Sequence, residues 1–200
     1  MYNGNVKSKI EVVDGIYKTE NISLPRSGHH LLKNILCEYF GDNLHYCSLY
    51  ESLPELKMDE NVKTNFQKNH DFDLKTLVKE DRKYIIQIRE PIDIVESTYH
   101  LQKRVGTSII IPNYESWRKE SIDILEYCHQ FVIKWVYTFV PNRLVMTYND
   151  LILRPSSVMN SVIQHLCGKV EIDDKKLQMA LSKFKPQIQL INRSVFYERA

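Results

Sequence analysis

The sequence lacks the apolar segments that place a chain in a membrane. Its first residues, MYNGNVKSKIEVVDG, contain no continuous apolar core of the kind that signal peptides have. The best candidate for a membrane span, FVIKWVYTFV, carries Lys134 and is much shorter than the roughly 20 apolar residues that a bilayer requires. We therefore expect no membrane insertion, and we predict a cytoplasmic location.

Cysteine is scarce and widely spaced. No two of the four cysteines form a C-x-x-C pair. They are Cys37, Cys47, Cys128 and Cys167. Because structural zinc sites use closely spaced ligand pairs, this spacing argues against bound zinc and favours free thiols in a reducing compartment. The sequence contains no other cluster of metal ligands, so we expect no metal.

Neither sign of charge is in excess. The 27 basic and 25 acidic residues leave a formal net charge of +2. That balance argues against nucleic acid and membrane surfaces as general partners, so any anion site must be local. A length of 200 residues suits one domain. Within it we expect a loose lead-in at residues 1–15 and a C-terminal segment, 185–200, that is either naturally short or truncated.

The chain also lacks the nucleoside-triphosphate loop G-x-x-x-x-G-K-[ST]. It therefore has neither the lysine nor the Mg²⁺-binding hydroxyl of a Walker A site. This absence argues against a P-loop kinase, which is the least favoured of three possible functions; the other two are given below.

What the sequence does contain is an alternation of strands and helices. The clearest strand is KYIIQIR, residues 83–89, whose nearly continuous apolar run is typical of a strand covered on both faces. Other strands are predicted at 16–24, 62–69 and 143–148, and helices at 29–40, from Pro91, at 121–140, at 155–167 and from Asp173 or Asp174 to about Phe184. The alternation predicts an α/β fold with a mainly parallel central sheet flanked by helices.

One stretch organises the rest of the chain, LPRSGHHLLKNILCEYFG at residues 24–41. It has the pattern of a strand exit, a tight loop containing Gly28, and an amphipathic helix. The first amides of a helix have no partners within it and carry partial positive charge, and Arg26 adds a full one. The stretch therefore predicts an anion site, although an ordinary strand–loop–helix connection with a surface arginine would have the same pattern.

Three polar clusters fall at the carboxyl ends of predicted strands. They are Arg26–Gly28, Lys68–His70 and Arg89, and Ser97 follows within the next helix. Because ligands of parallel α/β sheets bind outside the carboxyl ends of the strands, this coincidence favours the anion site.

These residues resemble the sulfotransferases that use 3′-phosphoadenosine 5′-phosphosulfate (PAPS). PRSGHHLLKNIL is similar to the family's 5′-phosphosulfate loop, and FQKNHDF resembles its K-x-H element. IIQIREPIDIVESTYH resembles the 3′-phosphate element, with Arg89 and Ser97 at the family's separation of eight. TYNDLILRPSSVMNSVIQHL is similar to a later segment. The resemblance spans about residues 23–168 and implies a P-loop-like sulfotransferase architecture.

The resemblance also implies an activity and roles for individual residues. The activity is in-line transfer of a sulfuryl group from PAPS to a hydroxyl or amine acceptor, with 3′,5′-diphosphoadenosine (PAP) as product and no metal. Arg26 and Lys68 would stabilise the leaving group and His70 would be the general base. The residues implied in binding PAPS are Arg26, Ser27, Gly28, His29, His30, Leu31, Arg89, Ser97 and Tyr148.

Each of these assignments has a plainer alternative. His70 could be structural and Lys68 a solvated surface charge. Arg89 could pair with Glu90 or Asp93. Ser97 could bond back to a carbonyl in its own helix, and Tyr148 could be a core residue.

The match departs from the family at several positions. His29 and His30 replace two loop hydroxyl residues, so either their rings donate to the phosphate or the backbone does. Leu31 replaces the aromatic that stacks on adenine, and Asp71 follows the proposed base where the family has leucine. The family's C-terminal Arg-Lys-Gly segment is also missing. These departures keep a second function open, a non-catalytic PAP- or nucleotide-binding module on a degenerate sulfotransferase scaffold.

The sequence does not identify the acceptor, which we expect to be a small molecule or a glycan. Its pocket would be formed by segments 43–59 and 103–119, which contain several aromatic residues. The oligomeric state is likewise not predicted.

Overall fold

The chain folds around one five-stranded parallel sheet. The structure, a computed structural model, describes residues 10–48, 63–105 and 114–197. The strands lie in the order β4 (Tyr46–Cys47), β5 (Phe66–Asn69), β3 (Thr19–Ser23), β6 (Lys83–Ile88) and β7 (Arg143–Thr147). Every neighbouring pair is parallel. The predicted α/β fold with a mainly parallel sheet is confirmed.

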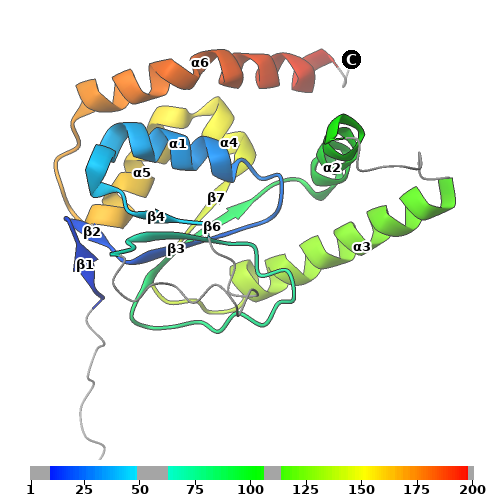
Figure 1. The fold of residues 1–200 in the computed structure, drawn as a ribbon, viewed down its shortest axis with the longest axis horizontal. Coiled ribbons are helices and arrows are strands. Elements are labelled where there is room, and N and C mark those ends of the chain that lie inside the picture. The colour runs from blue at the N-terminus through cyan, green and yellow to red at the C-terminus, as the bar shows by residue number, and fades with distance from the viewer. Residues whose placement is uncertain (1–9, 49–62, 106–113, 198–200) are drawn as a thin grey trace, which may run out of the picture.

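Helices cover both faces of this sheet (Figure 1). One face carries α1 (His29–Phe40), α4 (Tyr148–Leu153), α5 (Pro155–Cys167) and α6 (Asp174–Tyr197). The other carries α2 (Pro91–Val105), α3 (Tyr114–Val132) and the π-helical turn η2 (Ile133–Tyr137). Because side chains alternate along a strand, Ile85 joins the first core, whereas Tyr84 and Ile86 join the second.

Strand β3 is buried along its whole length although four of its five residues are polar. The two largest of these polar side chains have partners. Glu20 accepts from Arg82 at 3.2 Å and from Asn69 at 2.9 Å, and Asn21 Nδ2 donates to the carbonyl of Ile85 at 3.0 Å. These hydrogen bonds explain why a central strand tolerates polar residues at Glu20 and Asn21.

Several element boundaries differ from those predicted. The long helix starts at Tyr114 instead of residue 121, and beyond Val132 the backbone adopts the wider π geometry. Phe139, inside the predicted helix 121–140, lies beyond this π-helical turn and is 88% exposed. In α2 both Ile94 and Val95 are buried, whereas Ile92 is 62% exposed. The last helix continues to Tyr197, well past Phe184.

The remaining elements are short. Strand β1 (Val12–Val13), inside the segment predicted as a loose lead-in, pairs antiparallel with β2 (Ile16–Tyr17), and the turn η1 (Gly41–Asn43) follows α1. Of the two segments expected to form the acceptor pocket, most of 43–59 and residues 106–113 of the other lie outside the described residues. All four cysteine thiols are free. No helix within the described ranges is long and apolar enough to cross a bilayer.

Candidate active site

The loop between β3 and α1 is tightly braced. Ser27 Oγ donates to the carbonyl of Leu24 at 2.5 Å, and Gln87 Nε2 from the neighbouring strand donates to the carbonyl of Ser27 at 2.7 Å. The helix ladder begins only where Leu32 N donates to Gly28 O at 3.1 Å. The amides of residues 28–31 therefore precede the first helical hydrogen bond, at the positive end of the helix dipole.

Gly28 is required by its surroundings. Its φ of 87° lies in the left-handed region, and an added Cβ would lie 2.5 Å from Cδ2 of Tyr148. Tyr148 starts α4, and Thr147, the N-cap of that helix, accepts from Asp150 N at 2.9 Å. The tyrosine ring therefore packs directly on the loop, and only glycine leaves room for it.

Two arginines meet at this loop. Arg26 Nε donates to Ser97 Oγ at 3.0 Å, and an Arg89 terminal nitrogen donates to the carbonyl of Arg26 at 3.0 Å. The Arg89 guanidinium also lies 4.5 Å from the centre of the Tyr148 ring. The structure thus brings together Arg26, Gly28, Arg89, Ser97 and Tyr148, which the sequence places in four separate segments.

Positive charge in this cluster is only partly neutralised. Asp93 Oδ2 lies 3.7 Å from Arg89 Nε, which is buried and has no hydrogen-bond partner in the described structure. Burial lowers the pKa of Arg26, and the charges of Arg104 and Arg89 lower it further. No motif in the sequence pointed to Arg104. Its spacing of seven from Ser97, which puts both on one helix face, is the signal that could have found it.

Lys68 and His70 lie on the other side of β3. Both are buried, each 7% exposed, so neither is a solvated surface residue. His70 Nδ1 donates to the carbonyl of Ser23 at 2.5 Å, which leaves Nε2 as the unprotonated nitrogen of the neutral ring. Burial and the positive charges of Lys68 and His30 lower the pKa of His70 to about 4, against the raising effect of the Ser23 hydrogen bond.

The segment after His70 is anchored by a buried carboxylate. Asp71 accepts from Lys134 Nζ at 2.7 Å, from the indole of Trp135 at 2.8 Å and from the amide of Thr76 at 2.8 Å. Tyr127 OH donates to the carbonyl of His70 at 2.5 Å. The aspartate that departs from the family pattern thus fixes the His70 backbone to the helix layer beneath it.

His29 points into the protein. Because Asn21 Nδ2 donates to Ile85 O, the Asn21 oxygen must accept from His29 Nδ1, and His29 Nε2 then accepts from Tyr46 OH at 2.9 Å. Burial is the main reason that the pKa of His29 is lowered to about 2. Both ring nitrogens are used within the protein, so a phosphate contact from His29 could come only from its backbone amide.

Its neighbours on α1 differ from one another. His30 is exposed, and its pKa is lowered by partial burial and by the charges of Lys68 and Lys33. Leu31 packs in the apolar core. Its side chain therefore offers no surface on which adenine could stack.

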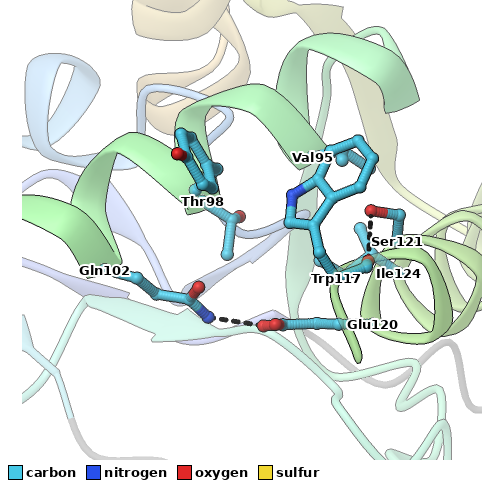
Figure 2. A pocket seen from close by; sticks show the side chains of 8 residues that line it. Val95, Thr98, Gln102, Trp117, Glu120, Ser121 and Ile124 are labelled. Atoms are coloured by element: carbon cyan, nitrogen blue, oxygen red, sulfur yellow. Dashed lines mark hydrogen bonds between the residues drawn. The ribbon is translucent and has the colours of Figure 1, made fainter. Parts of the chain in front are cut away.

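A small pocket lies away from this cluster, between α2 and α3 (Figure 2). Its volume of about 10 Å³ leaves room for one water molecule. Gln102 Nε2 donates to the Glu120 carboxylate across it, and Trp117 forms one wall. It is too small for an acceptor. In the described ranges no three side chains form a group that could hold a metal ion.

Comparison with known proteins gives a likeness of structure alone. No protein-family model and no curated protein matches the sequence. A sulfotransferase from Alicyclobacillus acidocaldarius matches with a TM-score of 0.50 and 14% identity over 86% of this chain and 92% of its own. Mouse sulfotransferase SULT7A1, complexed with PAP, matches with a TM-score of 0.58 and 18% identity over 88% of this chain.

A third structure is retinol dehydratase in complex with androsterone and the inactive cofactor PAP, with a TM-score of 0.57 and 13% identity over 91% of this chain. The matched region covers 66% of the mouse protein and 66% of retinol dehydratase. At these identities a match reports on architecture and not on activity. The order of the parallel strands, the loop before α1 and these neighbours lead to one conclusion: the chain has the sulfotransferase fold.

Proposed function

We propose that the chain is a PAPS-dependent sulfotransferase that acts on a hydroxyl or amine acceptor. The main support for this proposal is that Arg26, Arg89 and Ser97 converge beside the first amides of α1, which make no hydrogen bond within the helix. Such a site suits a ligand with two anionic groups. Two of the solved neighbours carry PAP, which supports the same ligand class.

The residues present fit such a ligand. Arg89 Nε is buried without a hydrogen-bond partner among the described residues, as expected of a donor that serves a bound group. Arg26 is surrounded by further cations, and an anion would relieve that repulsion. We assign Arg26 and the amides of residues 28–31 to the 5′-phosphosulfate, and Arg89 with Ser97 to the 3′-phosphate.

The chain's own groups then stabilise the transfer. PAPS, when bound, supplies an activated sulfuryl group. Arg26 and Lys68 place positive charge beside the phosphate oxygen on which negative charge grows during transfer. Donors that are already oriented stabilise that charge without reorganising, so they act on the transition state more than on the ground state.

His70 is the base in this proposal. Its Nδ1 proton is held by Ser23 O, so Nε2 is the nitrogen that would accept a proton from the acceptor. With a pKa of about 4 the ring is neutral at pH 7 but weakly basic. The nearby charge of Lys68 would lower the pKa of an acceptor hydroxyl as well, which favours an acidic hydroxyl such as a phenol over an amine.

The acceptor class and the location are parts of the same proposal. Retinol dehydratase was solved with androsterone, which supports a small-molecule acceptor, and a glycan is the alternative. Four free thiols accord with a reducing compartment, so we propose a cytoplasmic location.

The test is sulfuryl transfer from labelled PAPS to a panel of phenols, alcohols, amines and glycans. We expect His70→Ala to lower the transfer rate by a factor of at least about 100 with little change in PAP affinity. The matched control is His100→Ala, an exposed histidine on α2 that pairs with Glu96. Near wild-type transfer by His70→Ala would remove His70 from its role. PAP binding with no transfer to any acceptor would instead favour the non-catalytic nucleotide-binding module.

A further inference from the structure

Arg104 lies near the C-terminal end of α2, two turns beyond Ser97. Seven residues in an α-helix complete almost two full turns, so the two side chains leave the same face about 10 Å apart along the axis. Helical side chains lean toward the N-terminus of their helix, so that of Arg104 leans back toward Ser97. Ser97 is the residue that holds Arg26, at 3.0 Å.

Arg104 is close enough to Arg26 for their charges to interact. Its effect on the pKa of Arg26 is larger than that of Arg89, the arginine that bonds to the Arg26 backbone. Arg104 is exposed, and within the described ranges no carboxylate pairs with it. The acidic residues on this helix are engaged elsewhere, since Asp93 lies beside Arg89 and Glu96 beside His100.

Arg89 by itself is poorly equipped to hold a dianion. One terminal nitrogen already donates to the carbonyl of Arg26, and Asp93 lies 3.7 Å from its Nε. A terminal phosphomonoester carries close to two negative charges at neutral pH. An Arg89 that is partly neutralised by Asp93 therefore leaves such a group short of positive charge.

We propose that Arg104 is a third arginine of the anion site, and that it gives the site its preference for a nucleotide with a 3′-phosphomonoester. This inference rests on the proposed function, because it concerns the same nucleotide. In it, Arg26 serves the 5′ end, Arg89 and Ser97 contact the 3′-phosphate, and Arg104 adds the missing positive charge from the exposed side.

The experiment is calorimetric titration of the full chain with PAP and with adenosine 5′-monophosphate (AMP), which lacks the 3′-phosphate. We expect Arg104→Gln to weaken PAP binding about 10-fold and to change AMP binding less than about 2-fold, as for the loss of one charge-assisted hydrogen bond. Arg104→Lys keeps the charge but loses the two-pronged guanidinium, so it should restore part of the loss.

The matched control is Lys103→Gln, which removes the same charge from the adjacent, exposed position on α2 and faces a different direction. It should leave the PAP-to-AMP affinity ratio unchanged. If Arg104→Gln weakens both nucleotides equally, or neither, the inference is overturned while PAP binding by the wild type stands. If the wild type binds neither nucleotide, the proposed function fails and this inference fails with it.

Discussion

Two charged regions at the carboxyl ends of the strands are built in opposite ways. After β5, the carboxylate of Asp71 is fully buried and receives Lys134, Trp135 and the amide of Thr76. After β3 and β6, Arg26 and Arg89 lie together with one carboxylate at 3.7 Å and a buried nitrogen without a partner in the described structure. The buried charge of the first region is fully paired within the chain, whereas the positive charge of the second is only partly paired.

The difference distinguishes charges that stabilise the fold from charges that are available to a ligand. A buried charge must be fully hydrogen-bonded, or the fold loses several kcal/mol. Asp71 satisfies that requirement within the chain, so its partners stabilise the fold and hold His70 in place. The arginine cluster keeps part of its hydrogen-bonding capacity unused, and like charges repel one another there. A site of this kind is stabilised by an anion that comes from outside.

The largest effect is expected when the carboxylate is removed from the region after β5. Asp71→Ala leaves the ammonium of Lys134 and the indole of Trp135 without their buried acceptor. We expect the free energy of unfolding to fall by about 3–5 kcal/mol, measured by urea denaturation. Asp73→Ala, which removes an exposed partner of Lys75, should cost less than about 1 kcal/mol. Equal losses in the two variants would contradict the structural role of Asp71.

The opposite pattern is expected at the arginine cluster. Arg89→Ala should weaken PAP binding about 100-fold, since it removes a charged contact with the 3′-phosphate. The free energy of unfolding should change by less than about 1 kcal/mol, because loss of the hydrogen bond to Arg26 O is offset by relief of the repulsion between Arg89 and Arg26. The control is Arg154→Ala, which removes an exposed arginine that pairs with Asp150 just before α5. An unchanged PAP affinity by calorimetry would remove Arg89 from the site.

Local signals predicted much of both regions. The apolar run of β6, the glycine before α1 and the proline at the start of α2 each specify their element through nearby residues, and the structure agrees. The helix ends predicted from the sequence agreed less well with the structure. The π-helical turn at Ile133 and the continuation of α6 past Phe184 depend on packing that no short window records.

Contacts between distant segments were beyond the sequence. His29 looked like a phosphate donor, but its ring bonds to Asn21 and to Tyr46, and Tyr46 lies in a stretch that has no clear pattern. The Arg26–Ser97 bond joins residues 71 positions apart. The sequence gives the residue types at such a site, and only the folded chain brings the pairs together.

A third prediction tests the packing that joins the loop to Arg89. Gly28→Ala places a methyl group against the Tyr148 ring and forces alanine into a left-handed backbone. We expect a loss of about 1–3 kcal/mol in unfolding free energy and weaker PAP binding. In the double variant with Tyr148→Ala the steric part should disappear, so the two losses should not add. Strict additivity in urea denaturation would show that the ring and the glycine do not compete for space.

A further, pH-dependent effect concerns histidines that the fold keeps neutral. The pKa of His70 and that of His165 are lowered to about 4, and that of His29 to about 2, mainly by burial. Below pH 6.5 the unfolded chain therefore binds more protons than the folded one. Stability from these groups is complete above about pH 6.5 and is lost progressively as the pH falls toward 4.

Urea denaturation between pH 7 and 5 measures this dependence. Near pH 5 unfolding should take up about two to three protons through these groups. His165→Gln, away from the arginine cluster, should remove about one of them. A midpoint that stays constant from pH 7 to 5 would contradict the burial of neutral histidines.

The most direct test of the central claim is a crystal structure of the full chain with PAP. We expect the 5′-phosphate to lie against the amides of residues 28–31 and the 3′-phosphate to contact Arg89 and Ser97. PAP bound elsewhere, or with its 3′-phosphate turned away from both residues, would contradict it.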